Sequence, residues 1–212
     1  PFTVSVTEAV CVPVKPNPRG TLCPENLDLP ELLKDCSAAL IGCGMGNNED
    51  TARLVKELIK ISEIPLVIDA DGINALKGGI DIIEKSKAPI VLTPHPGEMA
   101  RLCSLTVGEV EENRVQIAKD FAVRHGCVLV LKGANTIVAA PNGEVYFNMT
   151  GNPGMSTGGS GDALAGITLS LLAQGFSAEY AAKAAVYLHG EAGDRAAARL
   201  GERGMLPSDL IE

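Results

Sequence analysis

The sequence predicts an α/β fold of three layers, in which helices cover both faces of a mostly parallel β-sheet with an antiparallel hairpin near its edge. Short apolar runs recur along the chain, and they are continuous rather than alternating, as in strands that are buried on both faces. Amphipathic helical segments separate these runs. Aromatic residues make up only 3% of the chain and Trp is absent, so Val, Ile, Leu and Ala must form the core, which suits stacked helix and sheet layers.

The strands are expected in the following order. Residues 2–6 alternate as a strand does, and residues 12–24 form an irregular surface loop interrupted by Pro and Gly. Four buried strands follow, at residues 38–41, 66–68, 90–92 and 128–131. Segments 136–140 and 144–148 then flank a Pro-Asn-Gly turn at 141–143, and this arrangement predicts the antiparallel hairpin.

Amphipathic segments between the strands predict the helices. Leu54, Leu58 and Ile61 share one face of a helix that Asn47 or Asn48 caps. Further helices are expected at residues 107–124, 162–174 and 178–199. The sequence contains no repeat, low-complexity tract or interdomain linker, so we expect one domain over residues 1–212.

Composition limits the classes of function. The formal net charge is −8 without a basic stripe, which argues against nucleic acid as a main partner but allows a loop to hold the phosphates of one nucleotide. No apolar run approaches the ~20 residues that span a membrane, and no signal-peptide pattern is present at the start. The six cysteines lack C-x-x-C spacing, which indicates thiols in a reducing compartment. A cytoplasmic protein is expected.

Three glycines, Gly42, Gly44 and Gly46, alternate directly after the strand at 38–41. Glycines at that place let a ligand approach the backbone closely. The dinucleotide-binding fingerprint requires G-x-G-x-x-G, and residue 47 is Asn, so the match to that motif is weak. A glycine-lined turn selected for packing explains the same residues equally well.

His95 follows the strand at 90–92 and stands between Pro94 and Pro96. The two prolines fix the backbone and hold the imidazole at the carboxyl end of the strand, where ligands bind in this class of fold. Pro96 suits the first turn of the next helix, and the charge of Glu98 suits the positive end of that helix. We predict a ligand contact for His95 and structural roles for His125 and His189.

Charged residues close two more strands. Asp69 and Asp71 follow the strand at 66–68, where an acid that binds a ribose would stand. Lys132 closes the strand at 128–131 and precedes Gly133, which places a cation where phosphates would be met. A lysine whose stem packs at the start of the hairpin is an equally good interpretation of Lys132 alone.

The most specific motif is the loop at residues 150–162, which contains five glycines and precedes a strongly apolar helix. Consecutive backbone N–H groups in such a loop form an anion site, and the helix terminus adds about +0.5 of an elementary charge. Asp162 falls in the first helical turn. A capping role is the alternative, but a carboxylate beside a bound phosphate is better explained as a general base for a hydroxyl that attacks it.

Together these motifs resemble a known family. Residues 158–162, Gly-Gly-Ser-Gly-Asp, look like the G-x-G-D anion-hole and base motif of the ribokinase-like superfamily. The whole set is similar to the ADP/ATP-dependent NAD(P)H-hydrate dehydratases of that superfamily, which repair damaged nucleotides. The segments that carry this resemblance are residues 44–46, 69–74, 93–98, 132–136 and 152–162.

The resemblance implies a ribokinase-like fold and removal of water from the hydrated nicotinamide of NADHX or NADPHX, at the expense of ADP or ATP. The ring hydroxyl would be phosphorylated, and phosphate would then leave. Mg²⁺ is expected with the phosphates, although no motif names its ligands, so the metal-binding residues stay unknown. Members of the family often form tetramers, so a homo-oligomer is also implied.

The resemblance also implies roles for individual residues. Gly46 and His95 would contact the hydrated dinucleotide, and Asp162 would contact it and take the proton from its hydroxyl. The adenine nucleotide and its phosphates would be held by Lys132, Gly133, Ala134, Asn135, Thr136, Gly158, Gly159 and Gly161.

The chain departs from the family pattern at its start, where the family's first glycine-rich strand–helix unit is not found. We therefore expect an N-terminally incomplete ribokinase-like domain. The main alternative is a small-molecule kinase of the same superfamily, of the hydroxymethylpyrimidine or hydroxyethylthiazole type. A non-catalytic dinucleotide-binding or sensor domain that uses residues 42–46 is a second alternative.

Overall fold

The computed structural model describes residues 9–211. These residues contain a six-stranded sheet whose strands lie side by side in chain order. The first four strands are parallel, and the last two are antiparallel to their neighbours. The predicted mixed sheet with a late hairpin is confirmed, whereas the predicted strand at residues 2–6 lies outside the described residues. The strands are β1 (Ala39–Ile41), β2 (Leu66–Ile68), β3 (Ile90–Leu92), β4 (Val128–Leu131), β5 (Ile137–Ala139) and β6 (Val145–Phe147).

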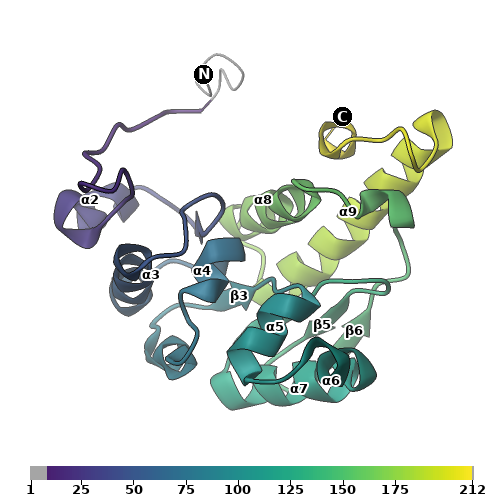
Figure 1. The fold of residues 1–212 in the computed structure, drawn as a ribbon, viewed down its shortest axis with the longest axis horizontal. Coiled ribbons are helices and arrows are strands. Elements are labelled where there is room, and N and C mark those ends of the chain that lie inside the picture. The colour runs from purple at the N-terminus through teal and green to yellow at the C-terminus, as the bar shows by residue number, and fades with distance from the viewer. Residues whose placement is uncertain (1–8, 212) are drawn as a thin grey trace.

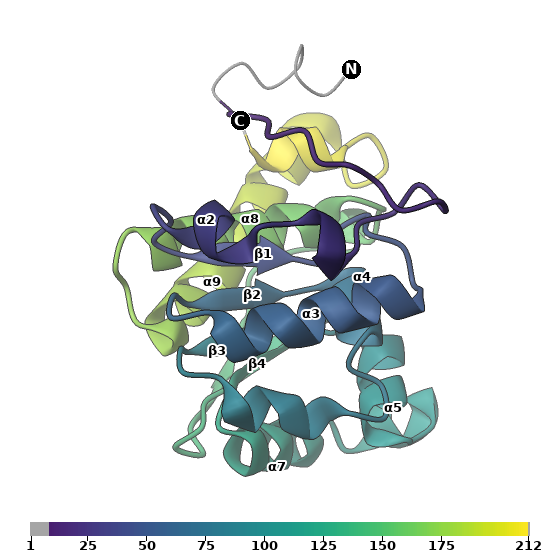
Figure 2. The ribbon, with the colours of Figure 1, turned by 90° about the vertical axis from the view of Figure 1, so that its left-hand side faces the viewer.

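Helices cover both faces of the sheet, as Figures 1 and 2 show. On one face lie α3 (Glu49–Ile61), α5 (Pro96–Cys103) and α7 (Arg114–His125), and on the other lie α8 (Ser160–Ala173) and α9 (Ala178–Leu200). The predicted three layers are therefore confirmed. The shorter elements are η1 (Pro24–Asn26), α2 (Leu29–Leu33), α4 (Ala70–Asn74), η2 (Ile80–Lys85), α6 (Val107–Glu112), η3 (Pro153–Met155) and η4 (Pro207–Leu210).

The strands divide their side chains between two cores. Leu66 and Ile68 of β2 pack with the layer of α3, while Val67 between them packs with α8 and α9. All three residues are fully buried, because each face of the sheet is covered. Burial of each such side chain contributes about 1.5–3 kcal/mol, which is why the strands appear in the sequence as continuous apolar runs.

The helix predicted at residues 107–124 is wrong as a single element. The structure breaks it at Asn113, whose φ of −128° ends α6 and lets α7 begin at Arg114. The Asn113 side chain donates to the Glu109 carbonyl at 3.4 Å, a local bond that competes with the helical backbone. Asn48, one of the two predicted residues, caps α3. Helix α8 begins at Ser160, two residues before the predicted start.

No helix within the described part of the chain combines the length and the hydropathy that crossing a membrane requires.

Gly42 directly follows β1, at the carboxyl edge of the sheet, and tolerates no side chain. Its φ is +129°, and a Cβ added there would lie 1.8 Å from the Asp69 carbonyl oxygen and 2.7 Å from the Gly72 nitrogen. Both contacts are with backbone, so the neighbouring loop cannot relieve the clash by a change of rotamer. The close approach of these two loops fixes the position of Asp69.

We predict that Gly42→Ala lowers the free energy of unfolding by more than about 3 kcal/mol, because it adds a backbone clash to an unfavourable φ. Gly44→Ala is the matched control. Gly44 also has a positive φ, +68°, but a Cβ added there would meet no heavy atom within 4 Å, so the expected cost is about 1 kcal/mol. Urea unfolding followed by circular dichroism measures both, and equal losses would contradict the assigned contact.

Candidate active site

The sequence-predicted site segments meet at one edge of the sheet. Because β1 to β4 are parallel, the segments that follow them emerge together, and α8 begins beside them. Gly46 follows β1 and donates its N–H to Asp71 Oδ2 at 2.8 Å. Gly161, in the first turn of α8, lies so near Lys132 that an added Cβ would be 3.3 Å from Lys132 Nζ. The loops after the strands and the start of α8 thus lie together and form one candidate site.

A buried ion pair lies at the centre of this site. Lys132 Nζ is 2.8 Å from Asp69 Oδ1 and 4.0 Å from Glu98 Oε2. The side chains of Asp69 and Glu98 are only 2% and 6% exposed, so both acids depend on the lysine for charge compensation. The stem of Lys132 lies at the start of the hairpin, and its ammonium reaches the two acids of the site.

His95 caps α5 with Nδ1, and its other ring nitrogen, Nε2, lies 3.5 Å from Glu98 Oε1. The N–H groups of Gly97 and Glu98 donate to His95 Nδ1 at 3.0 and 3.4 Å, and Glu98 Oε2 accepts from the His95 backbone N–H at 2.8 Å. Because Nδ1 accepts, the proton of the neutral ring lies on Nε2. The side chain is 51% exposed, so Nε2–H lies at the rim of the site, beside the Glu98 carboxylate.

Asp162 lies in the first turn of α8, as predicted, and is exposed. Gly159 caps this helix with a φ of +96°, a conformation that favours glycine. The first N–H groups of a helix lack intrahelical acceptors, and among the described residues Gly161 and Asp162 have no other acceptor for theirs. The helix terminus therefore presents free donors beside a carboxylate.

Cys43 lies close to Asp69 and Asp162, and the sequence analysis assigned it no role in a site. Its Sγ and the carboxylates of Asp69 and Asp162 all lie within 4.8 Å of one another. Burial raises the pKa of the Cys43 thiol to about 12, and a hydrogen bond to Asp162 and the charge of Asp69 act in the same direction. The thiol is therefore neutral at physiological pH.

Helix α9 holds the glycine-rich loop (residues 150–162) through the side chain of Asp194. Asp194 Oδ2 accepts from the Gly151 N–H at 2.8 Å, and Asp194 Oδ1 accepts from the Asn152 side chain at 3.0 Å. Asn152 in turn accepts from the Gly154 N–H at 3.0 Å. Sequence reasoning missed Asp194, because nothing in the composition of a helix reveals which acid faces a loop more than forty residues away.

Arg114 shapes the segment at residues 132–136 and was also missed. Its guanidinium donates to the Ala134 carbonyl at 2.6 Å and to the Leu131 and Lys132 carbonyls at 3.4 Å. Gly133 adopts a φ of +145°, and a Cβ there would lie 2.8 Å from Arg114 Nη2. The sequence carries no signal for this role, because Arg114 falls within a segment that reads as one continuous helix.

The other two histidines are buried and have side-chain partners, in agreement with their predicted structural roles. His125 Nδ1 lies 2.8 Å from Glu84, and His189 Nε2 lies 3.3 Å from the Ser160 hydroxyl. Burial lowers the pKa of His189, so its ring is a neutral support beneath the start of α8.

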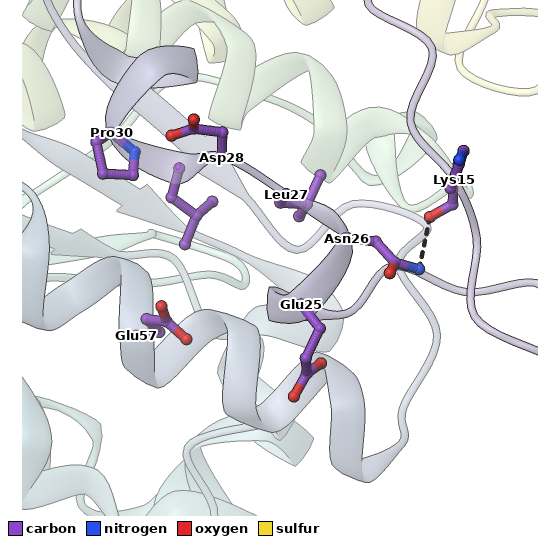
Figure 3. A pocket seen from close by; sticks show the side chains of 8 residues that line it. Lys15, Glu25, Asn26, Leu27, Asp28, Pro30 and Glu57 are labelled. Atoms are coloured by element: carbon purple, nitrogen blue, oxygen red, sulfur yellow. Dashed lines mark hydrogen bonds between the residues drawn. The ribbon is translucent and has the colours of Figure 1, made fainter.

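An open hollow of about 610 Å³ lies away from these residues, between η1, α2 and the side of α3 (Figure 3). Its wall includes Asn26, whose side chain donates to the Lys15 carbonyl at 3.0 Å. None of the predicted site residues lines it. The candidate site is therefore identified by the chemistry of its side chains and not by the volume of a cavity. The lining residues are Lys15, Glu25, Asn26, Leu27, Asp28, Leu29, Pro30 and Glu57.

The fold and the site define a class of protein. A mixed α/β sheet that brings a glycine-rich loop, a helix terminus and an acid to its carboxyl edge is the arrangement of the ribokinase-like superfamily. A solved ribokinase-like protein of Enterococcus faecalis is 32% identical, with a TM-score of 0.72 over 86% of this chain and 62% of its own.

Within that class, the chain belongs to the NAD(P)H-hydrate dehydratase family, whose model matches residues 4–212. A bifunctional NAD(P)H-hydrate repair enzyme of Moorella thermoacetica is 44% identical to this chain, in an alignment that covers 100% of this chain and 40% of that enzyme. The ADP/ATP-dependent NAD(P)H-hydrate dehydratase of Bacillus subtilis, co-crystallized with ATP/Mg²⁺ and soaked with CoA, is 32% identical with a TM-score of 0.76, over 82% of this chain and 62% of that one. The chain thus spans about two fifths of the bifunctional relative.

We predict that Lys132→Met lowers the free energy of unfolding by about 3 kcal/mol, because it leaves Asp69 and Glu98 buried without a cation. In the double variant Lys132→Met/Asp69→Leu, more than half of this loss should return, since one uncompensated charge is gone. Urea unfolding measures each variant. If Lys132→Met were as stable as the wild type, the ion pair would not carry the stated role.

We predict that Asp194→Ala speeds amide hydrogen exchange at Gly151 and Gly154, because it removes both acceptors that hold the loop. The loss of two hydrogen bonds should cost about 1–3 kcal/mol in the free energy of unfolding. Glu191→Ala is the control, since Glu191 pairs with Arg195 one turn away and not with the loop. Hydrogen exchange followed by mass spectrometry distinguishes the two, and equal exchange in both variants would refute the role of Asp194.

Proposed function

We propose that this protein removes water from hydrated NADH and NADPH, with consumption of ADP or ATP, and so restores the reduced dinucleotide. The single observation that carries the proposal is Asp162, an exposed carboxylate beside the free N–H groups that open α8. A site that only bound phosphate would not gain from a negative charge there. Membership of the dehydratase family supports dehydration as the reaction that Asp162 and these N–H groups serve.

The chemistry explains why a site of kinase type would catalyse a dehydration. Hydroxide is a poor leaving group at neutral pH, and transfer of a phosphoryl group converts the ring hydroxyl into a phosphate ester. Asp162 takes the hydroxyl proton while the oxygen attacks the terminal phosphorus and the nucleotide leaves. The C–O bond then breaks with loss of phosphate, and loss of a proton from the adjacent carbon restores the double bond.

In this proposal one group of residues binds the hydrated dinucleotide and another binds the adenine nucleotide. Gly46 and His95 contact the hydrated dinucleotide, and His95 Nε2–H is a donor whose ring orientation the cap of α5 already fixes. The N–H groups that open α8 stabilise the charge on the transferred phosphoryl group. The nucleotide is held by residues 132–136 together with Gly158, Gly159 and Gly161.

Mg²⁺ fits this site as a companion of the nucleotide. It takes oxygen ligands, keeps several waters and is commonly held by phosphates with one or two carboxylates. Among the described residues, the group of possible metal ligands nearest α8 contains only two carboxylates, Asp69 and Asp162, and its third member is a thiol. We propose that the phosphates supply most of the ligands and that the bound ion neutralises their charge.

The proposal is tested with the purified protein, NADHX, Mg²⁺ and either ADP or ATP, with NADH absorbance as the readout. NADH should return with at least one of the two nucleotides. Asp162→Asn should lower kcat by about 10²–10⁴-fold, the contribution of a general base. No return of NADH with either nucleotide overturns the dehydratase. Consumption of the nucleotide with phosphorylation of a thiazole or pyrimidine alcohol instead would identify the small-molecule kinase.

We predict different results for two substitutions of His95. His95→Asn retains a side chain that caps α5 but lacks the Nε2–H, so it should raise the KM for NADHX several-fold with little loss of stability. His95→Ala loses both functions and should also lower the free energy of unfolding by about 1 kcal/mol. Steady-state kinetics and urea unfolding separate these effects. An unchanged KM in His95→Asn would leave His95 with the capping role only.

A further inference from the structure

The group formed by Cys43, Asp69 and Asp162 has a composition that phosphoryl transfer does not explain. One sulfur and two carboxylates, from three separate segments, lie within 4.8 Å of one another. Ligands of a tetrahedral zinc ion lie about 3.5 Å apart, because its bonds to sulfur and oxygen are about 2.0–2.3 Å long. Exposed Asp162 and half-buried Cys43 are the two members that can move to close this difference, because Asp69 alone is buried.

The sulfur determines which cation the group suits. Mg²⁺ binds oxygen and does not select a thiol, whereas Zn²⁺ and related ions bind thiolate and carboxylate together. Three protein ligands with a fourth position open to solvent is a common arrangement for zinc. The bound ion would displace the thiol proton to solvent, and the two nearby carboxylates favour the cation.

A buried hydroxyl beside Asp69 is a second, independent observation. Thr93 is fully buried, and its Oγ1 has no hydrogen-bond partner. The Thr93 N–H donates to the Ile68 carbonyl at 3.3 Å, continuing the parallel pairing of β2 and β3, so Thr93 is the neighbour of Asp69 on the same face of the sheet. A buried hydroxyl without a partner is rare, and a ligand or its water at this place would satisfy it.

Lys132 neutralises Asp69, and the structure offers it another partner. Its Nζ lies 2.8 Å from Asp69 but only 4.0 Å from Glu98 Oε2, so a modest movement transfers the ammonium from one buried acid to the other. A cation that takes Asp69 therefore leaves no lysine charge without a partner.

We propose that Cys43, Asp69 and Asp162 form a binding site for a thiophilic divalent cation of the Zn²⁺ class, whose occupation withdraws Asp162 from catalysis. The binding itself is independent of the proposed dehydratase activity, and only the inhibitory consequence rests on it. Bound Zn²⁺ holds the carboxylate that would accept the substrate proton and draws Asp69 away from Lys132. The site thus makes the protein sensitive to free thiophilic metal in a way that Mg²⁺ does not reproduce.

The test uses Co²⁺ as a spectroscopic probe of the reduced protein. Thiolate bound to Co²⁺ absorbs in the near ultraviolet, so the band reports sulfur ligation and is silent for the other group of possible ligands, Asp81, Glu84 and His125, which contains no sulfur. The wild type should show the band, and Zn²⁺ but not Mg²⁺ should remove it. Cys43→Ala should lose the band, and Asp162→Asn should weaken Co²⁺ binding at least about tenfold.

Cys103→Ala is the matched control, since Cys103 is also half-buried but lies at the end of α5, outside the group. It should keep the band. In the dehydration assay, Zn²⁺ should inhibit the wild type and Cys103→Ala more strongly than Cys43→Ala, each relative to its own rate without Zn²⁺. A band that is absent from the wild type or persists in Cys43→Ala overturns the proposal. If the protein lacks dehydratase activity, the Co²⁺ band still decides the metal site.

Discussion

The pairing of Lys132 with Asp69 is the interaction on which the arrangement of the site depends. It joins the ends of β2 and β4 across the intervening β3, and it does so beneath the first turn of α8. Two glycines make it possible. Gly42 lets the backbone that carries Asp69 come within contact of the loop after β1, and Gly161 leaves space for the ammonium group. A side chain at residue 42 would separate the parts that the ion pair holds together, and one at residue 161 would force the ammonium group to shift.

This ion pair also explains why the proposed phosphate site would rely on backbone groups. Asp69, Glu98 and Asp162 give the site three acids, and Lys132 is already engaged by two of them. A phosphate would therefore meet little uncompensated positive side-chain charge, and the N–H groups that open α8 would have to supply much of the attraction. Since the whole chain carries a net charge of −8, long-range attraction does not help, and a nucleotide that arrives with Mg²⁺ is favoured over a free one.

The sequence was sufficient for features that depend on local patterns. The buried strands, the hairpin and the position of Asp162 in a first helical turn follow from continuous apolar runs and glycine spacing. It was insufficient where distant segments meet. Nothing local shows that Arg114 supports residues 132–136 or that Asp194 holds the glycine-rich loop, because those bonds join residues about twenty and forty positions apart. The broken helix at Asn113 was missed for a different reason, since the apolar spacing continues across it and does not register the local bond from Asn113 to the Glu109 carbonyl.

Those long-range bonds have a common consequence for how the site moves. The loop before α8 is held by Asp194 of α9, Ser160 at the start of α8 contacts His189 of α9, and the two helices pack along each other. The proposed anion-binding loop and the proposed base, Asp162, are therefore attached to the same pair of helices on one face of the sheet. His95, in contrast, belongs to α5 on the opposite face, where its own cap fixes it. Any relative movement of the two layers would change the distance between the proposed substrate contact and the proposed phosphoryl site, while Asp162 and the N–H groups that open α8 would keep their geometry.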